Sequence, residues 1–150
     1  ASDVYKRQVQ SRGVDASAAD AVTEENLDAC GELVRGLAEQ CGCVVCATGA
    51  IDAVSDGTEV FYVKNGDPML CDVTGTGCMC SALTGAACAA GGALAGALAA
   101  VVLLGLAGEY AAEECRRAGA GIGTFRVKLM DAVYAIRERD ILERGAVYDA

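Results

Sequence analysis

The sequence predicts one α/β domain in which helices pack on a small sheet. Three observations predict it. An amphipathic helical pattern leads into a short, continuous apolar run, two further apolar segments flank a tight turn, and a long alanine-rich region follows a Gly-Thr-Gly loop. A chain of 150 residues is long enough for one domain with a sizeable core. No internal repeat, linker or shift in composition marks a second domain.

The first predicted element is an amphipathic helix that ends before Gly42. Its apolar positions have helical spacing and are Leu27, Cys30, Val34, Leu37, Ala38 and Cys41. Thr23 and the acidic residues after it are typical of a helix start, and Gly42 is typical of a stop. The following run, Cys43 to Ala47, is typical of a strand buried on both faces of a parallel sheet.

The next segments predict a hairpin and the entry to a second helix. Ile51 to Ser55 and Glu59 to Lys64 flank Asp56-Gly57, a dipeptide that favours a tight turn. After another turn at Asn65 to Pro68, Met69 to Val73 is expected to form a short strand. The Gly-Thr-Gly loop then opens a helix that begins near Cys78.

The region from Ser81 to Gly108 contains no charged residue and is long enough to cross a bilayer. Two buried helices separated at Gly91-Gly92 explain it better, because alanine and glycine dominate and neither end has aromatic anchors or a basic flank. The second helix is expected to continue to Arg117. A last amphipathic helix carries Phe125, Leu129, Val133 and Ile136 on one face.

Composition restricts the possible chemistry. The net charge of −9 argues against a nucleic-acid binder, because no basic cluster could neutralise a run of phosphates. The nine cysteines are odd in number and follow no signal peptide, which favours a reducing cytoplasm over a disulfide framework. The chain has no histidine, so any catalysis must use carboxylates, thiols or backbone groups.

The loop Gly75-Thr76-Gly77 is the strongest candidate site. Glycines at a junction leading into a helix let the backbone approach a ligand, and the free N–H groups of the helix N-terminus then form an anion hole. A tight turn that needs glycine for steric reasons alone would give the same pattern.

The wider run Asp72-Val73-Thr74-Gly75-Thr76-Gly77-Cys78 resembles the D-x-x-G-x-G-D loop of the ribokinase-like kinases, with Cys78 in the place of the last aspartate. Cysteine there, after T-G-T-G, resembles the hydroxyethylthiazole kinases, which phosphorylate a thiazole alcohol in thiamine salvage. Further segments follow in family order: Arg12 to Asp15, Ala47 to Gly49, Asp52 to Gly57, Asn65 to Leu70 and Gly121 to Phe125. Ile122 and Asp67 depart from the proline and histidine that are usual at their positions.

The resemblance implies a ribokinase-like three-layer αβα sandwich, truncated to its C-terminal half, with residues 9–150 as half of one kinase domain and 1–8 as a non-native leader. It also implies ATP and Mg²⁺ as cofactors, 4-methyl-5-(2-hydroxyethyl)thiazole as substrate, and a cytoplasmic homotrimer when full length. No nucleic-acid or membrane partner is expected, and the fragment is expected to be inactive alone.

The same resemblance assigns roles to individual residues. Cys78 is the base that takes the substrate's hydroxyl proton, and a helix N-terminus makes a thiol proton more labile. The N–H groups of Gly75, Thr76 and Gly77 meet the transferring phosphoryl group. Thr48 contacts ATP, and Gly75 also lines the substrate site. No residue is assigned to metal.

Four other interpretations stay open. The chain could be another ribokinase-fold kinase, acting on hydroxymethylpyrimidine or a sugar, or a small membrane-associated protein spanning through residues 81–108. Cys41, Cys43 and Cys46 could form a metal or redox cluster, although buried cysteine more often behaves as a small apolar residue. Asp52 and Asp56 could be an acid/base or magnesium pair, or simply turn residues.

Overall fold

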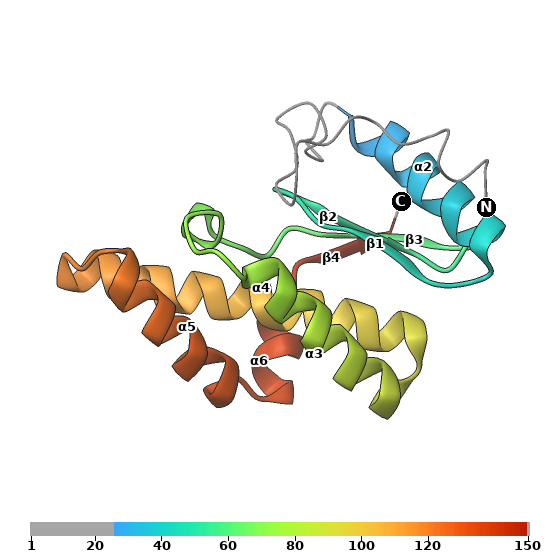
Figure 1. Ribbon diagram of the computed structural model, residues 1–150. Coiled ribbons are helices and arrows are strands. Elements are labelled where there is room, and N and C mark those ends of the chain that lie inside the picture. The colour runs from blue at the N-terminus through green and yellow to red at the C-terminus, as the bar shows by residue number, and fades with distance from the viewer. Residues whose placement is uncertain (1–25, 150) are drawn as a thin grey trace.

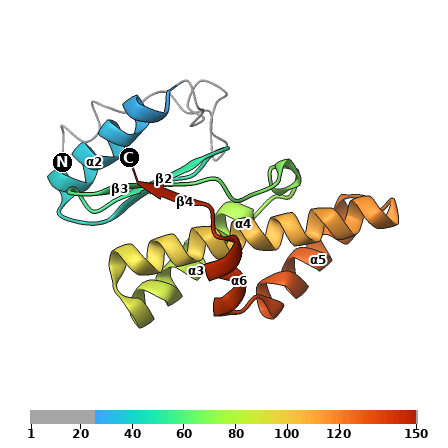
Figure 2. The ribbon, with the colours of Figure 1, turned by 180° about the vertical axis from the view of Figure 1, so that it is seen from behind.

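A computed structural model describes residues 26–149 and shows a sheet between one helix and a group of helices (Figure 1). Helix α2 lies on one face of the sheet, and α3, α4, α5 and α6 lie on the other; the view from behind shows the same layers (Figure 2). The predicted αβα layering is therefore confirmed. The expectations for 1–8, for Arg12 to Asp15 and for a helix start near Thr23 lie outside the described residues.

Helix α2, Leu27–Cys41, contains the predicted apolar positions and ends where the sequence predicted. It ends at Gly42, whose φ of 63° is left-handed and whose N–H donates to Ala38 O at 2.9 Å. Val34 is buried against Ile51, Ala53 and Tyr62 of the sheet, which forms the smaller of two cores. The helical spacing of the apolar residues thus identified both the element and its buried face.

The sheet has four strands in the order of the chain, each antiparallel to its neighbour: β1 Val45–Ala47, β2 Asp52–Ser55, β3 Val60–Val63 and β4 Val147–Asp149. The predicted hairpin around Asp56-Gly57 is confirmed as β2 and β3. The prediction of a parallel strand buried on both faces is wrong, because β1 is half-buried and pairs antiparallel with β2. The connection between them is too short for a parallel crossover, which needs a dozen or more residues.

The prediction of a strand at Met69 to Val73 is also wrong. This segment forms a 3₁₀ turn, η1, Pro68–Leu70, followed by further turns. The Asp67 carboxylate accepts a hydrogen bond from Met69 N at 3.0 Å, and Pro68 occupies the first position of the turn. A capping aspartate and a proline with its fixed φ favour a helical turn over an extended chain here.

The uncharged region forms a helical hairpin of α3, Thr76–Gly91, and α4, Ala93–Ala118, so the predicted division at Gly91-Gly92 is confirmed. Gly92 breaks the helix with φ 88° and ψ 166°. Within the described residues, α4 alone is long and apolar enough to cross a membrane by length and composition, and 56% of its most apolar window is buried inside the protein. Its buried side chains form the larger core together with Val63, Phe125 and Leu129.

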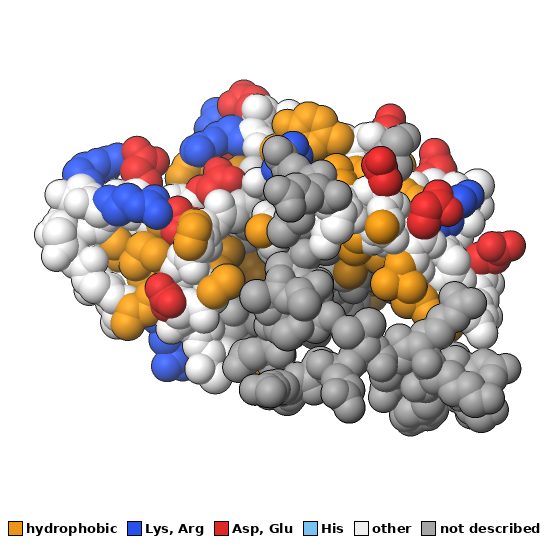
Figure 3. Space-filling model, turned by 90° about the horizontal axis from the view of Figure 1, so that it is seen from above, with side chains coloured by type: hydrophobic (Ala, Val, Ile, Leu, Met, Phe, Trp, Pro, Cys, Tyr) orange, Lys and Arg blue, Asp and Glu red, His pale blue; other side chains and the backbone are white. Residues whose placement is uncertain are grey.

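The chain continues after α4 with α5, Ile122–Ala135, α6, Glu138–Arg144, and β4. Phe125 and Leu129 are buried against α4 as predicted. The sequence did not predict α6 or β4, which are short and lack a clear apolar period. On the face shown in Figure 3, acidic and basic side chains are intermingled, with apolar side chains between them.

Candidate active site

The N-terminus of α3 is open to a ligand. Gly75 caps it with φ 100° and ψ −1°, and the first hydrogen bond of the helix runs from Met79 N to Gly75 O at 2.9 Å. The N–H groups of Thr76, Gly77 and Cys78 have no hydrogen-bond acceptor within residues 26–149. Three free donors at the positive end of a sixteen-residue helix form an anion site.

The side chain of Thr76 stabilises the loop before this helix. Its hydroxyl donates to Leu70 O at 3.1 Å and lies 3.3 Å from Val73 O, so it faces the preceding turns. The Thr76 N–H accordingly remains without an acceptor in the described chain, while its hydroxyl holds the loop closed. The sequence analysis did not predict this role of the hydroxyl.

Asp67 ties the same loop to the far end of α4. Its second carboxylate oxygen lies 2.7 Å from Arg116 Nη2, while the first accepts the Met69 N–H. Asp67 stands where histidine is frequent in the family. It fixes η1 through one hydrogen bond within the turn and one ion pair with α4. Ile122 stands where proline is usual in the family. It is the first residue of α5, a position that favours proline in many helices.

Cys78 has the exposure that a catalytic thiol needs. It is the third residue of α3 and is exposed, whereas Cys46 and Cys80 are half-buried below it. Burial raises the pKa of the Cys46 thiol to about 12 and also raises the pKa of the Cys80 thiol, so both stay protonated at neutral pH. Among the thiols of α3, Cys78 is the one placed to exchange a proton with a bound ligand.

The structure supports neither the three-cysteine cluster nor the Asp52 and Asp56 pair as a functional site. Among the described residues, no three cysteine or acidic side chains come close enough to hold a metal ion, Cys41, Cys43 and Cys46 included. Asp52 and Asp56 stand at opposite ends of β2 and do not form a pair. Asp56 is exposed and accepts from Thr58 N and Glu59 N, which lowers its pKa and makes it a turn residue.

Thr48, the predicted ATP contact, is exposed on the connection between β1 and β2. The next residue, Gly49, donates its N–H to Asp52 Oδ1 at 2.8 Å. Figures 1 and 2 show this connection and the loop before α3 at the same end of the sheet. No hydrogen bond joins Thr48 to residues 75–78 within the described chain. The structure thus assembles four predicted site residues at one helix terminus and places Thr48 on a neighbouring loop.

Comparison with known proteins gives consistent matches. The model of the hydroxyethylthiazole kinase family matches residues 2–139. A hydroxyethylthiazole kinase of Alkaliphilus oremlandii is 39% identical over 97% of this chain and 51% of its own length. One from Methanobrevibacter smithii is 34% identical over 91% of this chain and 48% of its own length. The solved structure of the hydroxyethylthiazole kinase protein from Pyrococcus horikoshii OT3 superposes with a TM-score of 0.77 at 39% identity, covering 85% of this chain and 48% of that chain.

The layered sheet and the open helix terminus, together with the structural match, define an α/β protein of the ribokinase-like class. Within that class, the chain belongs to the hydroxyethylthiazole kinase family. It spans about half the length of the curated relatives it matches.

Proposed function

We propose that this chain supplies the phosphoryl-transfer half of an ATP-dependent kinase that phosphorylates the hydroxyl of 4-methyl-5-(2-hydroxyethyl)thiazole. One observation carries the proposal. In a chain of this family, the free N–H groups of Thr76, Gly77 and Cys78 stand beside an exposed thiol at one helix terminus. An anion site next to a candidate base is what transfer of a phosphoryl group to an alcohol requires.

Each residue at the terminus has a defined task in this proposal. Cys78 is the base that takes the proton from the substrate's hydroxyl as the hydroxyl oxygen attacks the γ-phosphorus of ATP, the bond from that phosphorus to the β-phosphate oxygen breaks, and ADP leaves. The N–H groups of Gly75, Thr76 and Gly77 receive the charge on the transferring oxygens, and they are already oriented by the helix and by the Thr76 hydroxyl. Gly75 lines the substrate site, and Thr48 contacts ATP.

The described residues hold no cluster that would bind Mg²⁺ by itself, so no catalytic step is assigned to that ion here. In the proposal it enters with the phosphates of ATP. Residues 9–150 act as the C-terminal half of one kinase domain. The complete protein works as a cytoplasmic homotrimer on a small alcohol, without a nucleic-acid or membrane partner.

A chimera tests the proposed function. The half of the Alkaliphilus oremlandii relative that matches this chain is replaced by this chain, and ADP release is followed with ATP, Mg²⁺ and the thiazole alcohol. We expect phosphorylated thiazole, with hydroxymethylpyrimidine a much poorer acceptor. The intact relative is the positive control. A folded chimera that binds ATP and transfers no phosphate to the thiazole, or that prefers the pyrimidine, contradicts the proposal.

A further inference from the structure

Asp52 is buried beside the candidate site and has no task in the chemistry described above. It is 9% exposed and is the first residue of β2. Asp56, at the other end of the strand, lies in solvent and serves a turn. An aspartate is seldom buried without a strong partner, because removing its charge from water is costly.

The hydrogen bond that Asp52 accepts comes from the residue next to Thr48. Gly49 N lies 2.8 Å from Asp52 Oδ1 and is the one hydrogen-bond partner that the described residues provide to this carboxylate. A bond from a backbone N–H to an ionised carboxylate is shorter and stronger than one to a neutral acceptor. The charge on Asp52 therefore determines how firmly the Thr48-Gly49 turn is held.

The surroundings of Asp52 also connect it to α3. Alternation along β2 directs Asp52 away from α2 and toward the helices on the opposite face. Among the described residues, the titratable groups that interact with it are the thiols of Cys46 on β1 and Cys80 on α3. Its cross-strand neighbour is Val63, and the buried residues of α4 from Gly96 to Gly108 carry no charge. The carboxylate thus lies between the turn that carries Thr48 and the helix that carries Cys78.

Within residues 26–149, no cation pairs with this carboxylate. Burial raises the pKa of Asp52 to about 6, and the Gly49 hydrogen bond only partly opposes that rise. An asparagine could accept the same hydrogen bond without the cost of burying a charge. The presence of aspartate at this position gives the turn a stronger, charge-assisted bond that depends on pH.

We propose that Asp52 is a positioning residue for nucleotide binding, in which the ionised carboxylate holds Gly49 N–H and thereby sets Thr48 beside the N-terminus of α3. This inference rests on the proposed function, since it assumes that Thr48 contacts ATP. Protonation of Asp52 weakens the bond, releases the turn and lowers the affinity for ATP.

The test uses the chimera described above and compares the form with this chain's own residues, here called the wild type, with its Asp52→Asn variant. In the wild type, the Gly49 amide proton resonance is expected to shift with pH, with a midpoint near 6. The dissociation constant for Mg-ATP, measured by calorimetry, is expected to rise about tenfold from pH 7.5 to pH 5, because only about a tenth of the chains then carry the ionised carboxylate. In Asp52→Asn, both effects are expected to vanish apart from the titration of ATP itself, and the affinity at pH 7.5 is expected to fall about tenfold. Asp56→Asn, at the exposed end of the same strand, is the matched control and is expected to behave like the wild type.

Two failures are distinguishable. If the unsubstituted chimera folds but binds no Mg-ATP at any pH, the proposed function is overturned, and this inference with it. If Mg-ATP binds but Asp52→Asn has the affinity and pH profile of the wild type, the Asp52 inference alone is overturned. If Asp52→Asn does not fold, the two pH profiles measured on the wild type test the proposal. Coincident midpoints for the Gly49 resonance and for ATP affinity support the proposal, whereas an amide that does not titrate overturns it.

Discussion

At the scale of single residues, Cys78 is the predicted site residue whose role is most directly testable. In the active chimera, Cys78→Ala is expected to lower turnover by about 10²- to 10⁴-fold, the usual contribution of a general base. Cys78→Asp is expected to retain a substantial part, because a carboxylate at the same helix terminus can also accept the proton. ADP release at saturating substrates measures both.

The matched control for Cys78 is Cys71→Ala, which removes another exposed thiol from the loop before α3. We expect its turnover to remain near that of the unsubstituted chimera. A Cys78→Ala variant with the same turnover as the unsubstituted chimera would contradict the assignment of Cys78 as the base.

Gly75 allows a second prediction at this scale, because its φ of 100° is one that residues with a side chain rarely adopt. No atom lies within 4 Å of the Cβ that alanine would add, so strain in the backbone is the main cost. Gly75→Ala is expected to reduce the free energy of unfolding by about 1–2 kcal/mol in urea titrations.

Gly85→Ala is the control for that measurement. Gly85 lies on the exposed side of α3 with open space around its Cα, and its φ is not positive. Alanine is expected to stabilise the protein there by about 0.5–1 kcal/mol through its helix propensity. The same sign of change at both glycines would contradict the conformational argument.

At the scale of elements, the hairpin of α3 and α4 depends on the absence of a side chain at Gly96. A Cβ at this buried position would collide with the backbone of Cys88 on α3. Backbone atoms cannot move aside as the end of a side chain can, so the two helices would have to separate.

Gly96→Ala is therefore expected to destabilise the protein by about 1–3 kcal/mol, despite the higher helix propensity of alanine. Thermal unfolding of Gly96→Ala beside Gly85→Ala separates packing from propensity, since both glycines belong to the same hairpin. A stabilised Gly96→Ala variant would show that the two helices do not approach as closely as described.

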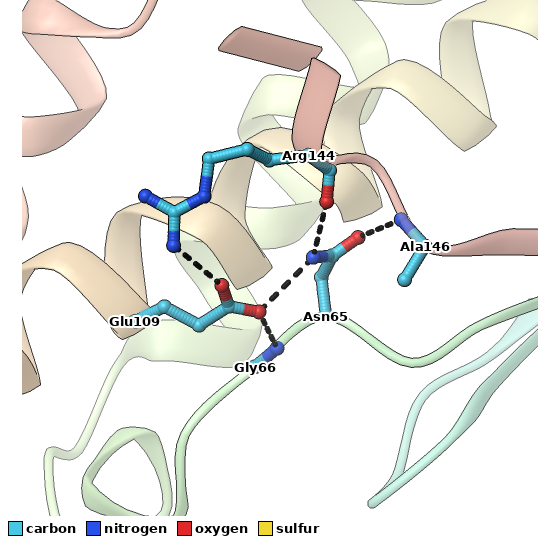
Figure 4. A network of polar contacts seen from close by, with 5 residues as sticks. All are labelled: Asn65, Gly66, Glu109, Arg144 and Ala146. Carbon is cyan, nitrogen blue, oxygen red and sulfur yellow. Dashed lines mark hydrogen bonds and ion pairs between the residues drawn. The ribbon is translucent and has the colours of Figure 1, made fainter. Parts of the chain in front are cut away.

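At the scale of the whole molecule, Asn65 connects three elements that are far apart in the sequence (Figure 4). Its side-chain nitrogen donates to Glu109 Oε1 on α4 at 3.0 Å and to Arg144 O on α6 at 3.1 Å, and its oxygen accepts from Ala146 N at 2.7 Å. Glu109 also accepts from Gly66 N and pairs with Arg144. This network holds the C-terminal segment, including β4, against the end of β3.

Asn65→Ala is expected to lower the free energy of unfolding by about 2–4 kcal/mol, because three part-buried hydrogen bonds are lost at once. The peptide bonds after α6 are expected to become more sensitive to limited proteolysis than those of α2, since α2 packs against the other face of the sheet. Unfolding in urea and mapping of the cleavage sites measure the two effects. A loss below about 0.5 kcal/mol would contradict the role of this network.

The stability of the molecule should also depend on the proton of Asp52. Its pKa is raised to about 6 in the folded chain, against about 3.9 in an unfolded one. Between these values the folded state holds the proton more tightly, so the contribution to stability is complete below about pH 4 and is lost as pH rises through 6. The shift corresponds to roughly 2–3 kcal/mol.

Asp52→Asn removes the pH dependence of stability that comes from the proton of Asp52. The stability of the variant minus that of the wild type is therefore expected to increase by about 2–3 kcal/mol between pH 4 and pH 7 in urea titrations. The other carboxylates are common to both proteins and cancel in the difference. A difference that is constant with pH would show that Asp52 titrates normally.

The sequence by itself determined the four longer helices, α2 to α5, and the candidate loop. The spacing of apolar residues in α2 and α5, the glycines at 42 and 92, and the Asp56-Gly57 turn act through local geometry, and local geometry can be read along the chain. The run from Asp72 to Cys78 identified the family for the same reason, and it predicted the residues of the candidate site.

The tertiary structure decided the rest, because the remaining features join residues that are distant in sequence. An apolar run such as Val45–Ala47 does not reveal the direction of its neighbour, which here depends on the short connection to β2. Asp52 interacts with Cys80 of α3, and the fixed η1 turn depends on Arg116. The return of β4 to the sheet depends on Asn65, and no local pattern could have revealed a hydrogen bond to a residue 81 positions away.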